Sequence, residues 1–363
     1  MTDAEARPAL SIRGLYKVFA DADGEALELS RSGKSKDEVQ EATGAVVGLR
    51  DISIEIAQGE LFVVMGLSGC GKSTLVRCIN RLIEPSDGEV WIDDREITAM
   101  SEDELRETRR RELAMVFQHF GLMPHRTVMD NVALPLEIGG VARRERRERA
   151  ANALDLVGLS EWITSMPSQL SGGMKQRVGL ARGLAMETPM LLMDEPFSAL
   201  DPVIRRDLQD ELLALQSSVQ KTIVFITHDL NEAVRVGDRI AIMRDGEIVQ
   251  LGAPSDVVLN PADAFVREFT QDVRLHGMVT AASIMDTSPE AMAGPTDQRY
   301  VVREDAVLDA LVPAGLSATL PLQVVNDSDE LVGVIPLQRL ARAMVSDEAA
   351  ASLAVNAGEQ GSN

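Results

Sequence analysis

One short segment combines glycine, lysine and hydroxyl residues at a spacing that suits phosphate binding. Residues 66–74 read Gly-Leu-Ser-Gly-Cys-Gly-Lys-Ser-Thr, and they follow an apolar run and open a helical pattern. Such a turn points backbone N–H groups at a phosphate, and the helix N-terminus adds partial positive charge. Lys72 would reach the terminal phosphates, and Ser73 would ligate Mg²⁺. We therefore predict a nucleotide site at Gly66, Ser68, Gly69, Cys70, Gly71, Lys72, Ser73 and Thr74.

Two adjacent carboxylates end a second apolar run, which reads Leu-Leu-Met-Asp-Glu-Pro over residues 191–196. Asp194, at the end of a strand, would hold the metal that accompanies the nucleotide, directly or through water. Glu195 lies one residue further along and can act as the general base for an attacking water. Together with the phosphate-binding turn, this pair predicts a nucleoside triphosphatase rather than a binding module without activity.

A glycine pair far along the chain forms a second candidate anion site. Residues 170–177 read Leu-Ser-Gly-Gly-Met-Lys-Gln-Arg. Ser171 suits a helix N-cap, and Gly172 and Gly173 leave N–H groups uncovered at the start of that helix. The segment matches the signature sequence of ATP-binding cassettes, with Met174 where glutamine is commoner.

With these three motifs, residues 10–270 resemble the ATP-binding-cassette ATPase family, and further family elements follow in order. Gln118, at the end of Met-Val-Phe-Gln, matches the glutamine that senses the metal and the membrane subunit. Asp201, in Ser-Ala-Leu-Asp, matches the loop that crosses the dimer interface. His228, in Ile-Thr-His-Asp, matches the histidine that contacts the γ-phosphate and positions the attacking water. Phe19 aligns with the aromatic residue that stacks on adenine.

The resemblance implies ATP and Mg²⁺ as the bound groups and assigns roles to the motif residues. Catalysis would fall to Glu195, His228, Gln118 and Lys72, and the metal would be held by Ser73, Gln118 and Asp194. Two copies would pair head to tail as a homodimer, so that each pocket is completed by the partner's copies of Ser171, Gly172 and Gly173. Cys70 would make the site sensitive to thiol reagents. The other histidines match no motif and are predicted to be surface or packing residues: His119, His125 and His276.

Short apolar segments alternate with amphipathic ones around these motifs, which predicts a mostly parallel sheet flanked by helices. Strands are expected at residues 10–18, 49–56, 60–65, 90–92, 113–117, 190–193, 222–226 and 239–243. Helices are expected at residues 36–43, 72–82, 102–110, 127–139, 143–157, 172–185 and 204–219. The resemblance adds that this α/β fold is an ABC-type P-loop NTPase, with a mixed sheet core, an antiparallel β part and a helical subdomain.

The chain is predicted to contain two domains. The ATPase domain would occupy residues 1–277, with a helical subdomain at about 119–185 and a polar insertion at about 21–47. Residues 278–345 resemble a shortened CBS module, with strands expected at 322–325 and 331–335 and a helix at 337–344. Residues 346–363 are predicted to be a flexible tail. The sequence leaves open whether the small domain packs or dimerises the chain, or senses ionic strength or a nucleotide.

Longer stretches narrow the resemblance to importers of glycine betaine and proline betaine. They include the insertion, residues 115–128 around Gln118, and residues 222–230 around His228. Relatives also import choline, carnitine and other quaternary amines, so the solute stays open. The resemblance implies integral membrane permease subunits and an extracytoplasmic solute-binding protein as partners, and osmoprotection as the role. An amino-acid or other small-solute importer is the main alternative.

The bulk composition disfavours several other classes of protein. The 363 residues carry a net charge of −21, which opposes binding to nucleic-acid phosphates or anionic lipid. A soluble ABC ATPase of nucleic-acid metabolism is therefore only a remote alternative. No apolar stretch approaches the roughly 20 residues that span a bilayer, and no signal peptide is evident. We expect a peripheral protein on the cytoplasmic face of the inner membrane, where the two cysteines stay reduced.

Overall fold

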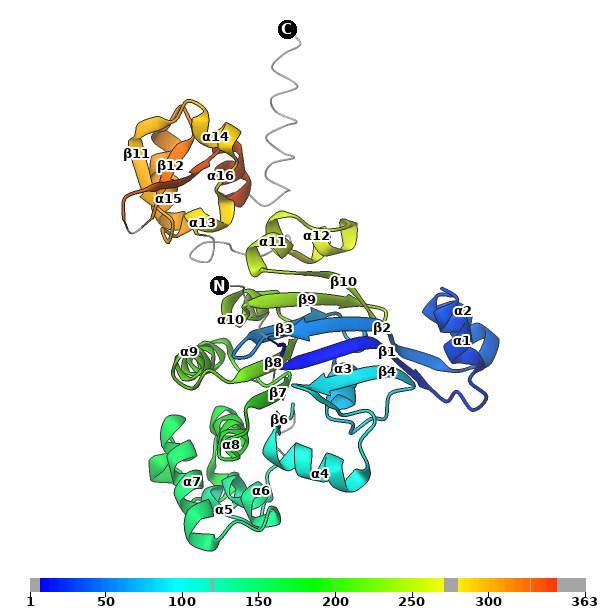
Figure 1. The fold of residues 1–363 in the computed structure, drawn as a ribbon. Helices are drawn as coiled ribbons and strands as arrows, with labels where there is room; N and C mark the ends of the chain where they lie inside the picture. The colour runs from blue at the N-terminus through cyan, green and yellow to red at the C-terminus, as the bar shows by residue number, and fades with distance from the viewer. Residues whose placement is uncertain (1–6, 119–120, 199, 271–279, 327, 345–363) are drawn as a thin grey trace. The chain divides into compact units, whose positions relative to one another are not determined.

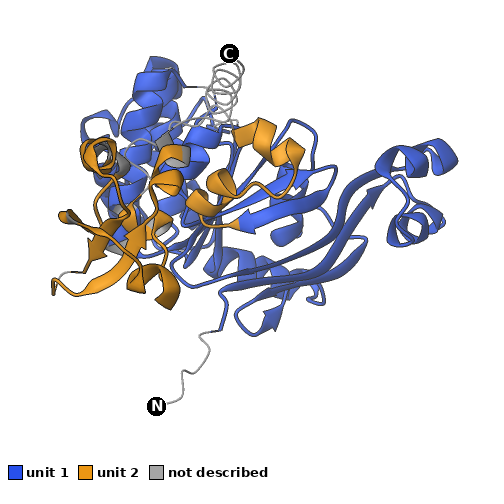
Figure 2. Cartoon of the chain, turned by 90° about the horizontal axis from the view of Figure 1, so that it is seen from above, with its two compact units in different colours: residues 1–251 blue, residues 252–363 orange. Residues whose placement is uncertain are grey.

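The computed structural model describes residues 7–118, 121–198, 200–270, 280–326 and 328–344. The chain divides into two compact units, Met1–Leu251 and Gly252–Asn363 (Figure 2). The predicted domain boundary at residues 277 and 278 and the predicted tail lie outside the described residues, as do His119 and His276.

A six-stranded sheet forms the centre of the first unit (Figure 1). Its order is β10-β9-β3-β8-β7-β6, and β3 is parallel to β8 and β9, while β7 is parallel to β6 and β8. Strands β3, β7 and β8 are buried along their whole length, which explains their continuous apolar sequences. Their carboxyl ends therefore meet at one edge of the sheet. The strand bounds are Leu61–Gly66 (β3), Leu113–Val116 (β6), Met190–Asp194 (β7), Thr222–Thr227 (β8), Arg239–Arg244 (β9) and Glu247–Gly252 (β10).

A second, antiparallel sheet has the order β2-β1-β4-β5. Its strands are Leu10–Phe19 (β1), Val46–Ile56 (β2), Asp87–Ile92 (β4) and Arg95–Glu96 (β5). Helix α3 (Lys72–Ile79) shares one apolar core with both sheets, through Leu75, Val76 and Ile79. The predicted combination of a mixed α/β core with an antiparallel part is confirmed.

Most helices of the first unit were predicted, whereas the helix at Leu230–Val236 was not. Their bounds are Glu102–Arg111 (α4), Val128–Val132 (α5), Leu134–Ile138 (α6), Arg143–Leu156 (α7), Gly172–Leu184 (α8), Pro202–Val219 (α9) and Leu230–Val236 (α10), with 3₁₀ turns at Ser160–Trp162 and Pro167–Gln169. The prediction of a single helix at residues 127–139 was wrong, because the helix is interrupted at Ala133 and forms two short helices. The break places Pro135 in the first turn of α6, where its missing N–H leaves no hydrogen bond unmade.

Helix α3 ends three residues before its predicted end at residue 82. Asn80 terminates it, because its side-chain Oδ1 accepts a hydrogen bond from Leu82 N at 3.0 Å. Arg81 then takes a left-handed conformation, with a φ of 53°, which is incompatible with continuing the helix. Helical periodicity alone does not reveal this competing side-chain bond.

The insertion folds into two short helices, α1 (Glu25–Arg31) and α2 (Lys36–Thr43), of which only α2 was predicted. The Asp21 carboxylate accepts hydrogen bonds from the N–H groups of the first turn of α1, at Ala26 and Leu27. Ser35 caps α2 in a reciprocal capping box with Glu38. A small apolar cluster packs the helices against the antiparallel sheet: Val18, Ala26, Val39, Ala45 and Val47.

The second unit contains a three-stranded sheet of order β11-β12-β13, in which β11 and β12 are parallel and β12 and β13 are antiparallel. The predicted strands and helix at residues 322–344 are present as β12 (Leu322–Val325), β13 (Leu331–Ile335) and α16 (Leu337–Met344). The other elements are Pro254–Leu259 (α11), Ala264–Thr270 (α12), Ala281–Ile284 (α13), Pro289–Ala293 (α14), Asp297–Arg303 (β11) and Leu308–Ser317 (α15). Over the described parts of the chain, no helix is both long and apolar enough to cross a bilayer.

Candidate active site

A cavity of about 660 Å³ lies where β3, β7 and β8 end. It brings together most of the residues predicted for the nucleotide site and for catalysis: Phe19, Ser68, Gly69, Gly71, Lys72, Ser73, Thr74, Gln118, Glu195 and His228. Residues that were not predicted also line it: Lys36, Val46, Val47, Gly48 and Leu67. Residues from seven separate parts of the chain thus meet around one space.

The turn between β3 and α3 has a backbone that requires glycine at two points. Gly66 has a φ of 150°, and a Cβ there would meet the Met243 carbonyl oxygen at 2.2 Å. Gly71 has a φ of 110°, and a Cβ there would meet the Gly48 carbonyl oxygen at 2.4 Å. The turn is therefore held close to neighbouring backbone, and any side chain at these positions would distort it.

Lys72 is buried at the start of α3, with 4% of its surface exposed. Its Nζ donates hydrogen bonds to the carbonyl oxygens of Gly66 at 2.8 Å and Leu67 at 3.0 Å. These bonds hold the ammonium group inside the turn, at the wall of the cavity. A positive charge fixed in this position is suited to a polyphosphate.

Ser73 and Asp194 form the polar pair expected of a metal site. Ser73 Oγ donates to Asp194 Oδ1 at 2.8 Å, and Asp194 is almost fully buried at the end of β7. Arg77 Nη2 lies 3.6 Å from Asp194 Oδ2 and offsets the buried carboxylate charge. A hydroxyl and a carboxylate are hard oxygen donors of the kind that Mg²⁺ takes alongside phosphate oxygens and water, so these residues fit that ion.

Glu195 lies at the centre of a three-residue group. Gln118 Nε2 donates to Glu195 Oε2 at 3.3 Å, and His228 Nδ1 lies 3.1 Å from the same oxygen. The backbone of Glu195 is left-handed, with a φ of 46°, and its N–H donates to the Ile226 carbonyl of β8 at 3.1 Å. The carboxylate is thereby aimed at the cavity by backbone geometry as well as by its neighbours.

Arg205, which the sequence analysis missed, connects two loops of the site. From α9 it donates through Nη1 to Asp229 at 3.0 Å and through Nη2 to the Leu200 carbonyl at 3.2 Å. Leu200 belongs to the loop before α9, and Asp229 is the neighbour of His228. No sequence motif marks this arginine, because its side-chain partner, Asp229, lies 24 residues further along the chain, at the start of another helix.

Other predicted site residues lie outside the cavity of the single chain. Ser171 caps α8 through its Oγ, which accepts from Met174 N at 3.3 Å, and Asp201 caps α9 through Ile204 N at 3.2 Å. Ser171, Gly172 and Asp201 are exposed, whereas Gly173 is buried against Ile204. Their predicted role on the partner's nucleotide stays a prediction. The walls of the cavity cover Gly66, Cys70 and Asp194.

Phe19 is 37% exposed, and its ring lies over Gly48, where a Cβ would meet the ring at 2.8 Å. The Lys17 ammonium lies 5.1 Å from the ring centroid on one side. The ring therefore has a defined position at the end of β1, as a stacking surface requires. Adenine stacking on Phe19 remains a prediction.

The expected thiol sensitivity of the site finds no support in the structure. Cys70 and Cys78 are both buried, and burial raises the pKa of the Cys70 thiol and raises the pKa of Cys78 to about 12. Because the thiolate is the reactive form, a raised pKa leaves little of it near neutral pH.

We expect a thiol-specific maleimide to label native protein roughly tenfold or more slowly than unfolded protein near neutral pH. The labelling rate should rise steadily as the pH passes 9, because both thiols ionise above their usual range. Mass spectrometry of timed samples would measure each cysteine separately. Rapid labelling of Cys70 in native protein near neutral pH would contradict this.

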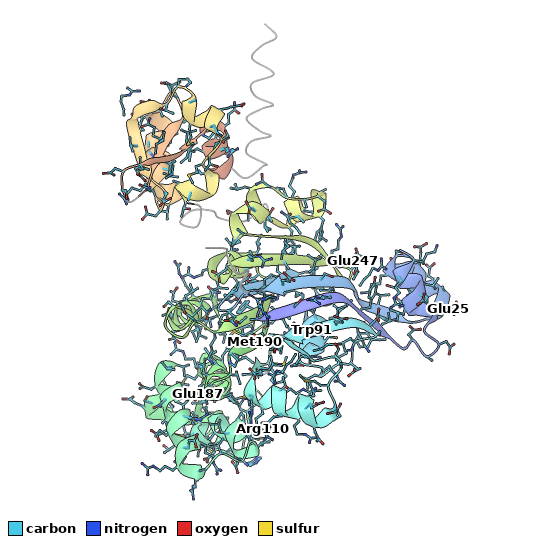
Figure 3. The ribbon with its side chains drawn as sticks, viewed as in Figure 1. Glu25, Trp91, Arg110, Glu187, Met190 and Glu247 are labelled. Atoms are coloured by element: carbon cyan, nitrogen blue, oxygen red, sulfur yellow. The ribbon has the colours of Figure 1, made fainter. Side chains whose placement is uncertain are left out.

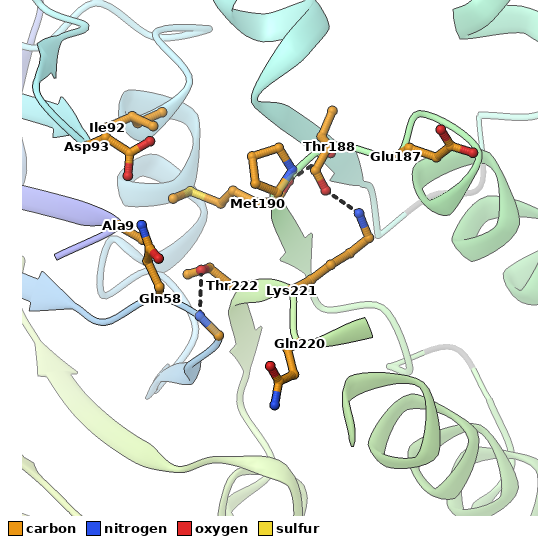
Figure 4. Close-up of a pocket in the computed structure, with 12 residues that line it drawn as sticks. Ala9, Gln58, Ile92, Asp93, Glu187, Thr188, Met190, Gln220, Lys221 and Thr222 are labelled. Atoms are coloured by element: carbon orange, nitrogen blue, oxygen red, sulfur yellow. Dashed lines mark hydrogen bonds between the residues drawn. The ribbon is translucent and has the colours of Figure 1, made fainter. Parts of the chain in front are cut away.

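A second cavity, of about 430 Å³, lies at the other ends of the strands (Figure 4). It is lined by residues that precede β7 and β8, including Thr188 and Lys221. Lys221 Nζ donates to the Thr188 carbonyl, and Gly59 N donates to Thr222 Oγ1 at 3.0 Å. These groups satisfy one another, and none of the motif residues reaches this cavity.

Comparisons with known proteins identify the family of the chain. The sequence profile described as "ABC transporter" matches residues 49–198. The chain is 52% identical to the glycine betaine/proline betaine transport system ATP-binding protein ProV of Salmonella typhimurium, over 79% of this chain and 72% of that protein. It is 44% identical to the trimethylamine N-oxide transport system ATP-binding protein TmoW of Ruegeria pomeroyi, over 91% of this chain and 95% of that protein.

A solved structure gives the same answer for the fold. The dimeric bacterial ABC transporter cassette MJ0796 aligns with a TM-score of 0.57 and 33% identity, over 68% of this chain and 98% of that chain. The same cassette has also been solved bound to ADP and phosphate. The chain therefore belongs to the ABC transporter family, as one of its ATP-hydrolysing subunits.

Proposed function

We propose that this chain powers the import of a quaternary or fully methylated amine by hydrolysing ATP in the cavity of the first unit. The observation that carries the proposal is the convergence of Lys72, Gln118, Glu195 and His228 on one space at the end of the parallel strands. The relatives point to the solute class, because their names specify glycine betaine, proline betaine and trimethylamine N-oxide.

The residues of the cavity suit attack of water on the terminal phosphorus of ATP. The phosphate-binding turn and Lys72 would hold the β- and γ-phosphates, while Phe19 would stack on the adenine. Glu195 would take a proton from the attacking water, and His228 would hold that water and the γ-phosphate in line. The bond between the γ-phosphorus and its bridging oxygen then breaks, which leaves ADP and phosphate.

Ser73 and Asp194, with Gln118 nearby, are the residues that would hold Mg²⁺. When bound, the ion supplies positive charge that offsets the phosphate oxygens. The hydrogen bond from Ser73 to Asp194 already sets the two oxygen donors 2.8 Å apart. The ion pair with Arg77 would help to orient Asp194 for this role.

The start of α8, where Ser171 and Gly172 are exposed, would act on the nucleotide of a second copy of the chain. In a head-to-tail homodimer, Ser171, Gly172 and Gly173 of one copy would cap the γ-phosphate held by the other copy. Uncovered N–H groups at the start of a 13-residue helix are suited to that anion. The dimeric cassette of known structure supports pairing of this kind.

The chain would work on the inner face of the membrane, bound to permease subunits that carry the solute, with a solute-binding protein on the other side. ATP-driven closing of the dimer would move the permease through the loop that holds Gln118. The small second unit would pack the assembly or sense ionic strength, and its likeness to a CBS module remains a prediction.

The proposal can be tested by uptake in cells that lack their own methylated-amine importers. The chain would be expressed with its proposed permease and binding protein, and supplied with labelled glycine betaine, choline, carnitine or trimethylamine N-oxide. We expect accumulation of at least one of these solutes, and none with a Lys72→Ala chain. Uptake of amino acids but of none of these amines would contradict the solute class.

A further inference from the structure

The insertion between β1 and β2 contributes one side chain to the nucleotide cavity. Lys36, the first residue of α2, lines the cavity together with residues of the phosphate-binding turn. It is only partly buried, so the residue lies in the wall of the cavity and is also in contact with solvent. The insertion is therefore part of the wall of the site as well as a surface feature.

The position of Lys36 is fixed by the packing of its helix. Val39, three residues further along α2 and on the same face, is fully buried against Val47 of β2. Val47 and its neighbours Val46 and Gly48 also line the cavity. Lys36 thus belongs to the wall of the cavity that includes Val46, which pairs with Phe19 in the antiparallel sheet.

Arg50 ties the insertion to both sheets of the first unit. Arg50 on β2 donates to the Ser30 hydroxyl of α1 at 3.2 Å and to the Lys34 carbonyl just before α2. Nη1 of the same guanidinium group donates to Glu247 Oε1 of β10 at 2.9 Å; Glu247 is labelled in Figure 3. These bonds to two sheets hold the start of α2 in place without any contribution from Lys36.

Lys36 is also the one cation of the insertion that is not neutralised among the described residues. Arg31 pairs with Glu28 and Asp87, and Lys34 pairs with Glu38 at 3.0 Å. No ion pair of Lys36 is found in the described part of the chain, although seven Asp and Glu residues lie between residues 21 and 44. A lysine that faces a cavity and keeps its charge available is suited to a ligand.

We propose that Lys36 binds the nucleoside end of the nucleotide, donating to an acceptor on the purine or ribose. This inference rests on the proposed function and adds a specific contact to it. An ammonium group is a donor only, and purine ring nitrogens and ribose oxygens are acceptors. The phosphates already have Lys72, the backbone of the turn and the start of α3, so the free cation on the Phe19 side serves the opposite end of the ligand.

The test compares binding of three ligands to Lys36→Ala, Lys36→Arg and a Lys34→Ala control, by calorimetry on the full-length chain. Lys34→Ala removes a neighbouring positive charge that does not line the cavity. We expect Lys36→Ala to raise the Kd for both ATP and ADP roughly fivefold to tenfold, as the loss of one charge-assisted hydrogen bond would do. Tripolyphosphate, which has no nucleoside, should bind equally to all variants, and Lys36→Arg should restore most of the affinity for ATP.

Three outcomes would overturn the inference. If Lys36→Ala binds ATP with unchanged affinity, Lys36 does not contact the nucleotide. If Lys36→Ala loses as much affinity for tripolyphosphate as for ATP, Lys36 contacts the phosphates and not the nucleoside. An equal loss in Lys34→Ala would reduce it to the general charge of the insertion. Failure of the unaltered chain to bind Mg-ATP would instead contradict the proposed function, so the two can be told apart.

Discussion

Replacement of Glu195 by glutamine is expected to lower ATP hydrolysis by the assembled transporter roughly 10²- to 10⁴-fold, the range set by loss of a general base. The amide has nearly the same shape and still accepts from Gln118, but it cannot take a proton from water. ATP binding should persist, because Glu195 holds none of the phosphates in the proposed arrangement. The variant should therefore accumulate as a dimer with ATP bound.

Steady-state phosphate release measures the rate, and size-exclusion chromatography with and without Mg-ATP measures the dimer. Glu187→Gln is a matched control, because Glu187 is an exposed carboxylate that pairs with Arg149 and does not line the nucleotide cavity. Its rate should equal that of the unaltered chain. Normal turnover in Glu195→Gln would remove Glu195 from the role of base.

Mixing two inactive variants should restore hydrolysis if each pocket is built from two copies. Lys72→Ala disables the phosphate-binding turn, and Ser171→Arg blocks the start of α8 with a bulky side chain. In a mixed dimer, both defects fall in one pocket, and the other pocket keeps an unaltered Lys72 and an unaltered Ser171. An equal mixture should regain roughly a quarter of the full rate, since half of the dimers are mixed and each has one intact pocket of two.

The controls are each variant alone and the doubly substituted chain mixed with Lys72→Ala. In that second mixture no pocket has both elements intact, so no rate should return. A mixture of the single variants that stays inactive, although crosslinking shows mixed dimers, would contradict pairing between copies.

The sequence predicted most strands and helices of the first unit because apolar runs and capping residues are local signals. Continuous burial of β3, β7 and β8 gives the unbroken apolar segments that were assigned as strands. The break at Ala133 and the early end of α3 were missed because they depend on Pro135 and on the side chain of Asn80. The signal that such single residues leave in the sequence is weaker than the helical periodicity around them.

Within the site, the predicted motif residues were those whose type alone limits their chemistry, such as Lys72 and Glu195. Lys36 and Arg205 were missed because neither belongs to a motif and both act across long separations in the sequence. Lys36 reaches the cavity only because α2 packs on β2, and Arg205 reaches Asp229 only because α9 and α10 are neighbours. Contacts of this kind follow from the tertiary structure and leave no pattern in the linear chain.

The left-handed backbone at Glu195 has a consequence for the balance between durability and activity. A residue with a side chain costs on the order of 1 kcal/mol more than glycine in that conformation. The chain accepts this penalty at the position of its proposed base, where glycine would relieve it and remove the carboxylate. Selection of variants for thermal stability alone would thus favour glycine at this position, and such variants would be inactive. Engineering of thermal stability must therefore include an assay of ATP hydrolysis.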